Sequence, residues 1–180
     1  MATVPKCLPV TMTMEIRPAT VDDAEALLAL RHRLAKETDF TSWDPGEIQG
    51  TVEKQRDAII AFDARGNSRY LLACDGEDLV GLILAAGGDR NRLRHRAVIA
   101  LGILRSHWSR GIASRLLSEI IDWAPGAGVT RLTLEVNVTN VRAISLYLRH
   151  GFVFEGRHQG SMRINGAYVD DYAMALMLET

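Results

Sequence analysis

The residues whose types and spacing could do chemistry begin with a small-residue turn, Ser109 to Ser114, ahead of an amphipathic segment. Gly111 and Ala113 stand where a helix would start, so the unpaired backbone N–H groups of its first turn stay uncovered by bulky side chains. Such N–H groups and the positive end of the helix dipole together suit a phosphate. Three nearby cations add positive charge: Arg105, Arg110 and Arg115. The turn therefore predicts a site for a phosphorylated ligand.

A second pattern, from Asn140 to Gly151, brings two polar side chains together on one helix. Asn140 can cap this helix and Gly151 can end it. Tyr147 lies seven residues after Asn140, about two turns, so both side chains project from nearly the same stripe. We expect the buried side of the helix to carry Val141, Ile144 and Leu148. By spacing alone, Tyr147 fits a core tyrosine better than a catalytic one.

Both patterns need a sheet to position them. Val98 to Leu104 has no polar side chain, which predicts a central strand that is covered on both faces. Apolar residues at helical spacing follow from Ile112 to Ile121, and an alternating strand follows over 129–136. A strand, a helix and a strand connected in this way form a right-handed parallel crossover.

The remaining elements are predicted from apolar periodicity and turn residues. They are a strand at 14–18, a helix at 21–36 capped by Thr20, a loop at 37–46, a helix at 47–62, hairpin strands at 69–74 and 79–86, and two final strands joined at Asn165-Gly166.

The turn matches neither G-x-x-x-x-G-K-[ST] nor G-x-G-x-x-G, so two common nucleotide-binding motifs are excluded. It resembles the acyl-CoA signature of the GNAT superfamily of N-acetyltransferases, Q/R-x-x-G-x-G/A, with Trp108 in the Gln/Arg position. The superfamily also carries N-x-x-A-x-x-x-Y-x-x-x-G-F, which this chain meets with Asn140, Ala143, Tyr147, Gly151 and Phe152. The resemblance runs from about residue 16 to 178. The tail resembles the ribosomal-protein and amino-acid acetyltransferase branch through Asn165, Gly166, Asp170 and Met174.

The resemblance implies an α/β (α+β) fold in one domain, residues 14–180, after a flexible leader at 1–13. The GNAT fold has a mixed sheet of about seven strands, largely antiparallel, with a parallel splayed pair at the cofactor site and about four flanking helices. Acetyl-CoA is the implied acetyl donor, and no metal is implied. The implied cofactor-binding residues are Leu101 and Ile103 through their backbones, then Ser109, Arg110, Gly111, Ile112, Ala113, Ser114, Asn140 and Tyr147.

The implied reaction moves an acetyl group from acetyl-CoA to a primary amine of a small molecule or a protein N-terminus, by direct attack in a ternary complex. The amine must lose a proton and the departing sulfur must be protonated. Tyr147 is the candidate acid, because a phenol is a neutral donor at pH 7. Glu135 is the candidate base, directly or through a water, and an exposed strand glutamate is the alternative. His107 fits a solvated loop better than a base.

The acceptor would enter between the first two helices, the loop at 37–46 and the hairpin at 157–168. Asp39, Asp170 and Asp171 could attract a cationic amine there. Three other classes of function stay open: a non-catalytic acyl-CoA-binding regulatory module, a structural subunit of a larger complex and, more distantly, a nucleotide-binding regulator. The identity of the amine is open, and so is the oligomeric state, with a homodimer among the alternatives.

Composition fits one globular domain and limits the partners. The 180 residues are 47% hydrophobic and carry a net charge of −1, so no overall charge would hold the protein on nucleic acid or an anionic membrane. No apolar run approaches the roughly 18 residues of a membrane span, and the first residues make a poor signal peptide. Cys7 and Cys74 suggest neither a zinc site nor a disulfide. We expect a cytoplasmic protein.

Overall fold

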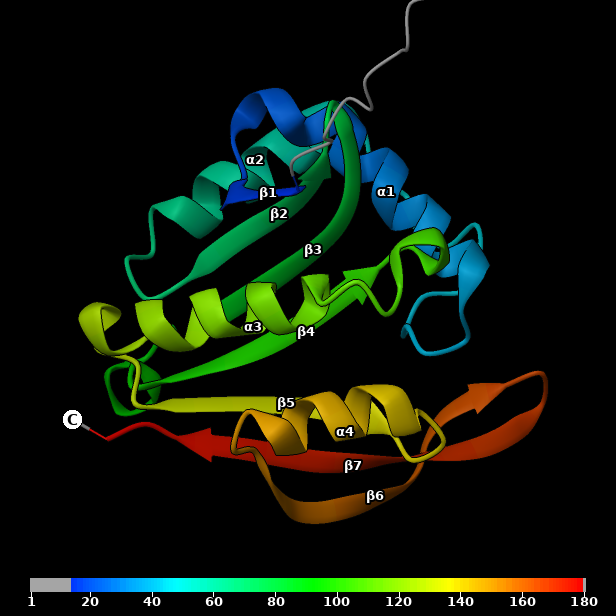
Figure 1. Cartoon of the computed structure of the whole chain (residues 1–180), viewed down its shortest axis with the longest axis vertical. Helices are drawn as coiled ribbons and strands as arrows, with labels where there is room; N and C mark the ends of the chain where they lie inside the picture. Colours follow the sequence, from blue (N-terminus) through cyan, green and yellow to red (C-terminus); the bar gives the residue numbers. More distant parts are fainter. Residues whose placement is uncertain (1–13, 180) are drawn as a thin grey trace, which may run out of the picture.

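Seven strands form one mixed sheet, as predicted, in the order β1-β2-β3-β4-β5-β7-β6 (Figure 1). The computed structural model describes residues 14–179, so the predicted leader at 1–13 lies outside the described residues. The strands are β1 (Met14–Pro18), β2 (Arg69–Asp75), β3 (Asp78–Gly87), β4 (Arg96–Ile103), β5 (Arg131–Asn137), β6 (Val153–Ile164) and β7 (Ala167–Met177).

Four α-helices cover the two faces of this sheet. They are α1 (Ala24–Glu37), α2 (Val52–Asp63), α3 (Ile112–Trp123) and α4 (Val141–Arg149). Figure 1 shows α3 and α4 on one face, in front of the central strands, and α1 and α2 behind β2 and β3. The apolar stripe of α3 is buried as predicted, through Ile112, Leu116, Leu117 and Ile120. The helix predicted at 47–62 instead begins at Val52, because the Thr51 hydroxyl caps it by accepting from the Lys54 N–H.

The parallel crossover from β4 through α3 to β5 is confirmed, and it shapes the centre of the molecule. β4 and β5 pair only over residues 96–98 and 131–133. Beyond Val98 and Thr133 the two strands diverge (Figure 1). All other neighbouring strands pair antiparallel, so this divergence opens the sheet at its only parallel pair among residues 14–179.

Two predictions of burial are wrong. β4 is covered on one face only: Ala97, Ile99 and Ile103 are buried, whereas the Val98 side is open and Val98 itself is 46% exposed. The buried side of α4 carries Leu146 and Tyr147, and Val141 is 71% exposed. Leu148, also predicted to be buried, is exposed. Both errors come from counting apolar residues as core when they line an open face.

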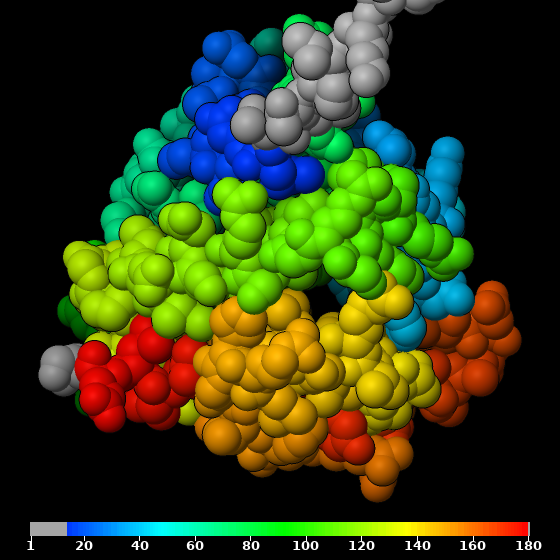
Figure 2. All heavy atoms as spheres, viewed as in Figure 1, coloured from blue at the N-terminus to red at the C-terminus, as the bar shows by residue number. Residues whose placement is uncertain are grey.

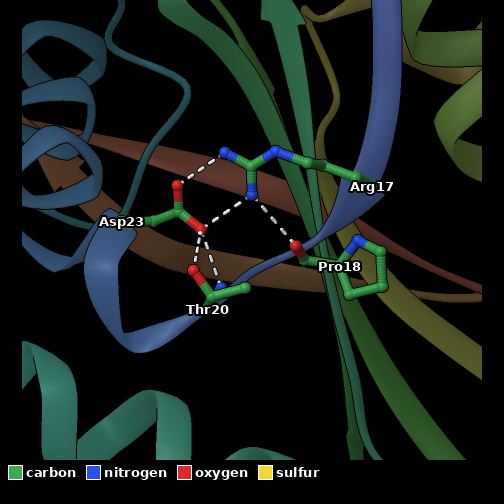
Figure 3. A network of polar contacts seen from close by, with 4 residues as sticks. All are labelled: Arg17, Pro18, Thr20 and Asp23. Carbon is green, nitrogen blue, oxygen red and sulfur yellow. Dashed lines mark hydrogen bonds and ion pairs between the residues drawn. The ribbon is translucent and has the colours of Figure 1, made fainter.

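The junction between β1 and α1 is held by a part-buried ion pair, drawn in Figure 3. Both oxygens of the Asp23 carboxylate accept from the Arg17 guanidinium, at 2.6 and 2.8 Å. Asp23 Oδ2 also accepts from the Thr20 N–H and hydroxyl, which forms the capping box of the predicted N-cap. The guanidinium holds the pKa of Asp23 down to about 2.

Candidate active site

A cleft of about 1320 Å³ lies where β4 and β5 diverge. Residues of the α1–α2 connection, β4, the start of α3, β5 and the start of α4 line it. Figure 2 shows a hollow on the surface, between the green atoms of the segment that leads into α3 and the yellow and orange atoms of the segment that leads from β5 into α4. The phosphate turn and the start of α4 both line it, so the fold opens at the point where the two sequence patterns meet.

The predicted phosphate turn forms one wall of this cleft. Ser109 and Gly111 both have positive φ, +62° and +77°, which is uncommon for serine. Gly111 occupies the N-cap of α3, and because it has no side chain it cannot cap the first N–H groups of the helix. The first intrahelical bond runs from the Arg115 N–H to the Gly111 carbonyl, which leaves the N–H groups of 112–114 for a ligand. Backbone N–H groups that converge in this way form an anion site.

Arginine side chains border the turn, with different partners. The Arg110 guanidinium lies 3.8 Å from the Asp75 carboxylate. Arg142, which the sequence analysis missed, donates to the Ser109 hydroxyl at 3.2 Å and lies 4.7 Å from the centre of the Trp108 ring. Its position two residues after the helix-capping Asn140 could have indicated it, because that position faces the turn across the cleft.

The edge of β4 that faces the gap presents backbone groups. The Leu104 N–H donates to the Val80 carbonyl of β3, so the groups of Leu101 and Ile103 point the other way, toward the gap. The Ile103 carbonyl already accepts from the Trp108 indole N–H at 2.8 Å.

His107 was predicted to lie in a solvated loop, and this prediction is wrong. Its Nε2 lies 3.1 Å from the Asp75 carboxylate and its Nδ1 lies 2.8 Å from the Ser106 hydroxyl. His107 therefore braces the turn against the β2–β3 hairpin.

Helix α4 supplies Asn140 and Tyr147 to the cleft. The Asn140 side chain accepts from the Ala143 N–H at 3.2 Å, which confirms it as the helix cap. Tyr147 is only 6% exposed and its ring packs on that of Phe152. Burial raises the pKa of Tyr147 to about 12. The phenol is therefore neutral across the physiological range and can only donate a proton.

Glu135 lines the same cleft from β5. Its side chain is 58% exposed, between the buried Leu134 and Val136, so it faces away from the core as predicted. Its carboxylate lies 3.4 Å from Nδ1 of His158 on β6. The site thus combines an exposed carboxylate with a buried phenol.

The three predicted acceptor carboxylates do not form one group. Asp171 lines the cleft, whereas Asp39 lines a second, shallower cavity beside Arg105. Asp170 is bound to the Arg157 guanidinium and to the Gly160 N–H. In residues 14–179, no three His, Cys, Asp or Glu side chains cluster as metal ligands would, and none of the helices there is long and apolar enough to cross a membrane.

Comparisons with known proteins agree with this geometry. Residues 33–152 match the model of the acetyltransferase (GNAT) family. The chain is 36% identical over 113 residues to the L-amino acid N-acetyltransferase AaaT of Escherichia coli, covering 62% of this chain and 69% of that protein. It is 33% identical over 111 residues to the N-alpha-acetyltransferase RimI of Mycobacterium tuberculosis, covering 62% and 67%.

Solved structures show the same fold. A GNAT-family acetyltransferase from Streptococcus pneumoniae superposes with a TM-score of 0.90 at 34% identity, covering 92% of this chain and all of that one. An acetyltransferase from Salmonella typhimurium, solved with acetyl-CoA, superposes with a TM-score of 0.83 at 19% identity, covering 93% and 95%. The phosphate turn, the divergent parallel pair and these matches lead to one assignment: the chain belongs to the GNAT family of acetyltransferases and takes its acetyl group from acetyl-CoA.

Proposed function

We propose that the chain acetylates a primary amine inside the cleft between β4 and β5, by direct attack of the amine while acetyl-CoA is bound. One observation carries the proposal. The uncapped start of α3, the phenol of Tyr147 and the carboxylate of Glu135 all line a single cleft. An anion site, a proton donor and a proton acceptor are what acyl transfer from a thioester to an ammonium requires.

The cofactor roles follow from which groups are free. The N–H groups of Ile112, Ala113 and Ser114 would hold the pyrophosphate, with Arg110 and the hydroxyl of Ser109 nearby. The gap-facing backbone of Leu101 and the N–H of Ile103 would pair with the pantetheine like an added strand. Asn140 borders the same path while it caps α4. Bound acetyl-CoA supplies the activated thioester.

The two proton roles are divided by environment. Glu135 is open to the cleft, so its carboxylate can accept the proton of the incoming ammonium, directly or through a water. Tyr147 is buried at the cleft wall and keeps its proton, so it would donate a hydrogen bond to the departing sulfur. Burial keeps the phenol of Tyr147 protonated, whereas the exposed carboxylate of Glu135 stays within reach of the amine and of water.

The acceptor wall of the cleft is formed by the α1–α2 connection. Phe40 and Trp43 are exposed there and line the cleft. Two relatives are named as an L-amino acid N-acetyltransferase and an N-alpha-acetyltransferase, and both names point to an α-amino group as the acceptor. We propose an acceptor of that kind. None of the contacts described favours a non-catalytic acyl-CoA-binding module.

We also propose a cytoplasmic enzyme, as expected from the sequence, and a homodimer formed through β6. The dimer proposal rests on the exposed edge strand β6 and on its apolar side chains Val153 and Phe154, which are 60% and 48% exposed. An edge strand with open N–H and C=O groups is a template for pairing with another chain. Analytical ultracentrifugation should give twice the monomer mass, and a monomer at micromolar concentration would reject the dimer.

The function is tested in two steps. A thermal-shift titration with acetyl-CoA should raise Tm by several degrees, whereas ATP and NAD should leave it unchanged, since a ligand at 100 times its Kd adds about 2.7 kcal/mol. CoA release is then measured with L-amino acids, with short peptides and with simple alkylamines. A shift with acetyl-CoA but no CoA release from any amine would leave a binding module, and no shift would reject the proposed site.

A further inference from the structure

Asp171 has a carboxylate oxygen that no group of the described protein satisfies. Asp171 is only 5% exposed and lines the cleft. Its Oδ2 accepts from the Ser161 hydroxyl at 2.7 Å. Its Oδ1 is buried and has no hydrogen-bond partner among residues 14–179. A buried carboxylate oxygen without a hydrogen-bond donor destabilises the folded state. A ligand that donates N–H groups to this oxygen would remove that cost.

On the same strand, the neighbouring Asp170 has hydrogen-bond donors for both of its carboxylate oxygens. Its Oδ2 accepts from Arg157, its Oδ1 accepts from the Gly160 N–H, and these bonds lower its pKa. Asp170 therefore organises the β6–β7 hairpin and is not available to a ligand. The motif residue Asp170 and the buried Asp171 have separate roles.

Strand register brings Asp171 close to the candidate base. Glu135 pairs with Ala173, and Asn137 pairs with Asp171. Asp171 is thus the diagonal neighbour of Glu135 on the same face of the sheet, at a typical separation of about 7 Å. An ammonium group that donates to Asp171 would have further N–H donors free for Glu135.

We propose that Asp171 binds the ammonium group of the acceptor and selects an amine that carries one such group beside an apolar body. This inference rests on the proposed acetyltransferase function. The charges of the cleft lining favour an acceptor with one ammonium group over a polyamine. Three carboxylates line it, Glu135, Glu155 and Asp171, against five arginines, Arg31, Arg96, Arg131, Arg142 and Arg149. Because Glu155 is already bound to Arg131, a second ammonium group would meet positive charge.

The test compares two matched variants with isoamylamine, which carries one ammonium group, as the acceptor. Asp171→Asn keeps the size of the side chain and a partner for Ser161, and should raise the KM for isoamylamine about tenfold or more while the KM for acetyl-CoA stays within about twofold. Asp170→Asn should leave both KM values within about twofold and lower Tm. An unchanged isoamylamine KM in Asp171→Asn would reject the inference and leave the acetyltransferase function intact.

A second test of the inference uses the wild-type enzyme, so its result does not depend on whether a variant folds. N,N-dimethylisoamylamine is cationic but gives no stable amide, and isoamyl alcohol has the same body without the charge. The cation should compete with isoamylamine at least about tenfold more tightly than the alcohol. Equal inhibition by the two would reject the inference. Wild-type protein that releases no CoA with any amine would instead reject the proposed function.

Discussion

The indole N–H of Trp108 donates a 2.8 Å hydrogen bond to the carbonyl of Ile103, and so fastens the phosphate turn to the gap-facing edge of β4. The same ring is contacted by the guanidinium groups of Arg105 and Arg142, 5.4 and 4.7 Å from its centre. Arg105 also bonds to Glu37 at the end of α1. In place of the Gln or Arg of the signature, this chain therefore has an aromatic anchor that links three elements around the cofactor path.

A variant that lacks the hydrogen bond from Trp108 to Ile103 but keeps an aromatic ring should hold the phosphate turn less firmly. Trp108→Phe should raise the KM for acetyl-CoA about fivefold and lower the free energy of unfolding by about 1 kcal/mol, since one part-buried hydrogen bond is lost. Steady-state kinetics and urea unfolding measure the two effects. An unchanged KM for acetyl-CoA would mean that the other contacts of the turn, those of His107 and of the arginines, are enough to fix it.

Tyr147→Phe tests the proposed acid without changing the packing of the ring on Phe152. We expect kcat to fall about 100-fold, because a positioned acid contributes in that range, with the KM for acetyl-CoA changed little. The pKa of about 12 adds a second expectation. Since the phenol stays protonated, the wild-type kcat should show no alkaline fall from Tyr147 below about pH 11. A variant with kcat within about twofold of wild type would remove Tyr147 from the chemistry.

Glu135→Gln separates the two ways of removing the proton from the amine. If the carboxylate acts as the base, kcat should fall about 100-fold at pH 7 and recover in part as the pH rises, because more of the amine is then neutral. For an acceptor amine of low pKa, kcat of Glu135→Gln should fall less, because more of that amine is already neutral at pH 7. The same measurements on His158→Gln serve as the control, since this change removes only the partner of Glu135 at 3.4 Å. Full activity of Glu135→Gln would indicate an ordered water as the base.

The order of the elements could be predicted from the sequence because each depends on local chemistry. Asn165-Gly166, both with positive φ, make the two-residue turn that this dipeptide favours, and Asn140 caps α4 as its type indicates. Thr20 caps a short 3₁₀ helix at 21–23, whereas α1 itself begins at Ala24 with Asp23 at its N-cap. Gly151, with φ of +86°, ends α4. These features need no knowledge of distant residues.

The open cleft could not be predicted in the same way. After Arg96, β4 is apolar, but whether its Val98 face is covered depends on how far α1 and α2 extend across the sheet, which no local pattern contains. The free oxygen of Asp171 likewise depends on which of two adjacent aspartates meets Arg157. Both facts are set by register between strands that are distant in sequence.

Gly87 should be intolerant of any side chain. A Cβ there would clash with the backbone oxygen of Asn67, whose side chain bonds to the Gly88 and Arg94 carbonyls. Gly87→Ala should therefore lower the free energy of unfolding by about 1–3 kcal/mol, as overpacking typically does. Gly126→Ala is the matched control, because its Cβ would meet nothing within 4 Å. It should be neutral or slightly stabilising. Equal unfolding midpoints for the two variants would contradict this.

The Arg17–Asp23 pair should make part of the stability depend on acid pH. The pKa of Asp23 is lowered from 3.8 to about 2, chiefly by its hydrogen bonds from Arg17. A carboxyl group with a depressed folded-state pKa contributes stability above its unfolded pKa and loses it as the pH falls toward the folded value. Asp23→Asn should thus cost about 2 kcal/mol at pH 7, and the difference from wild type should close between about pH 4 and pH 2. Urea unfolding across this range measures it, with the exposed neighbour in Asp22→Asn as the control. A difference that stayed constant with pH would show that the substitution acts through packing and not through the ion pair.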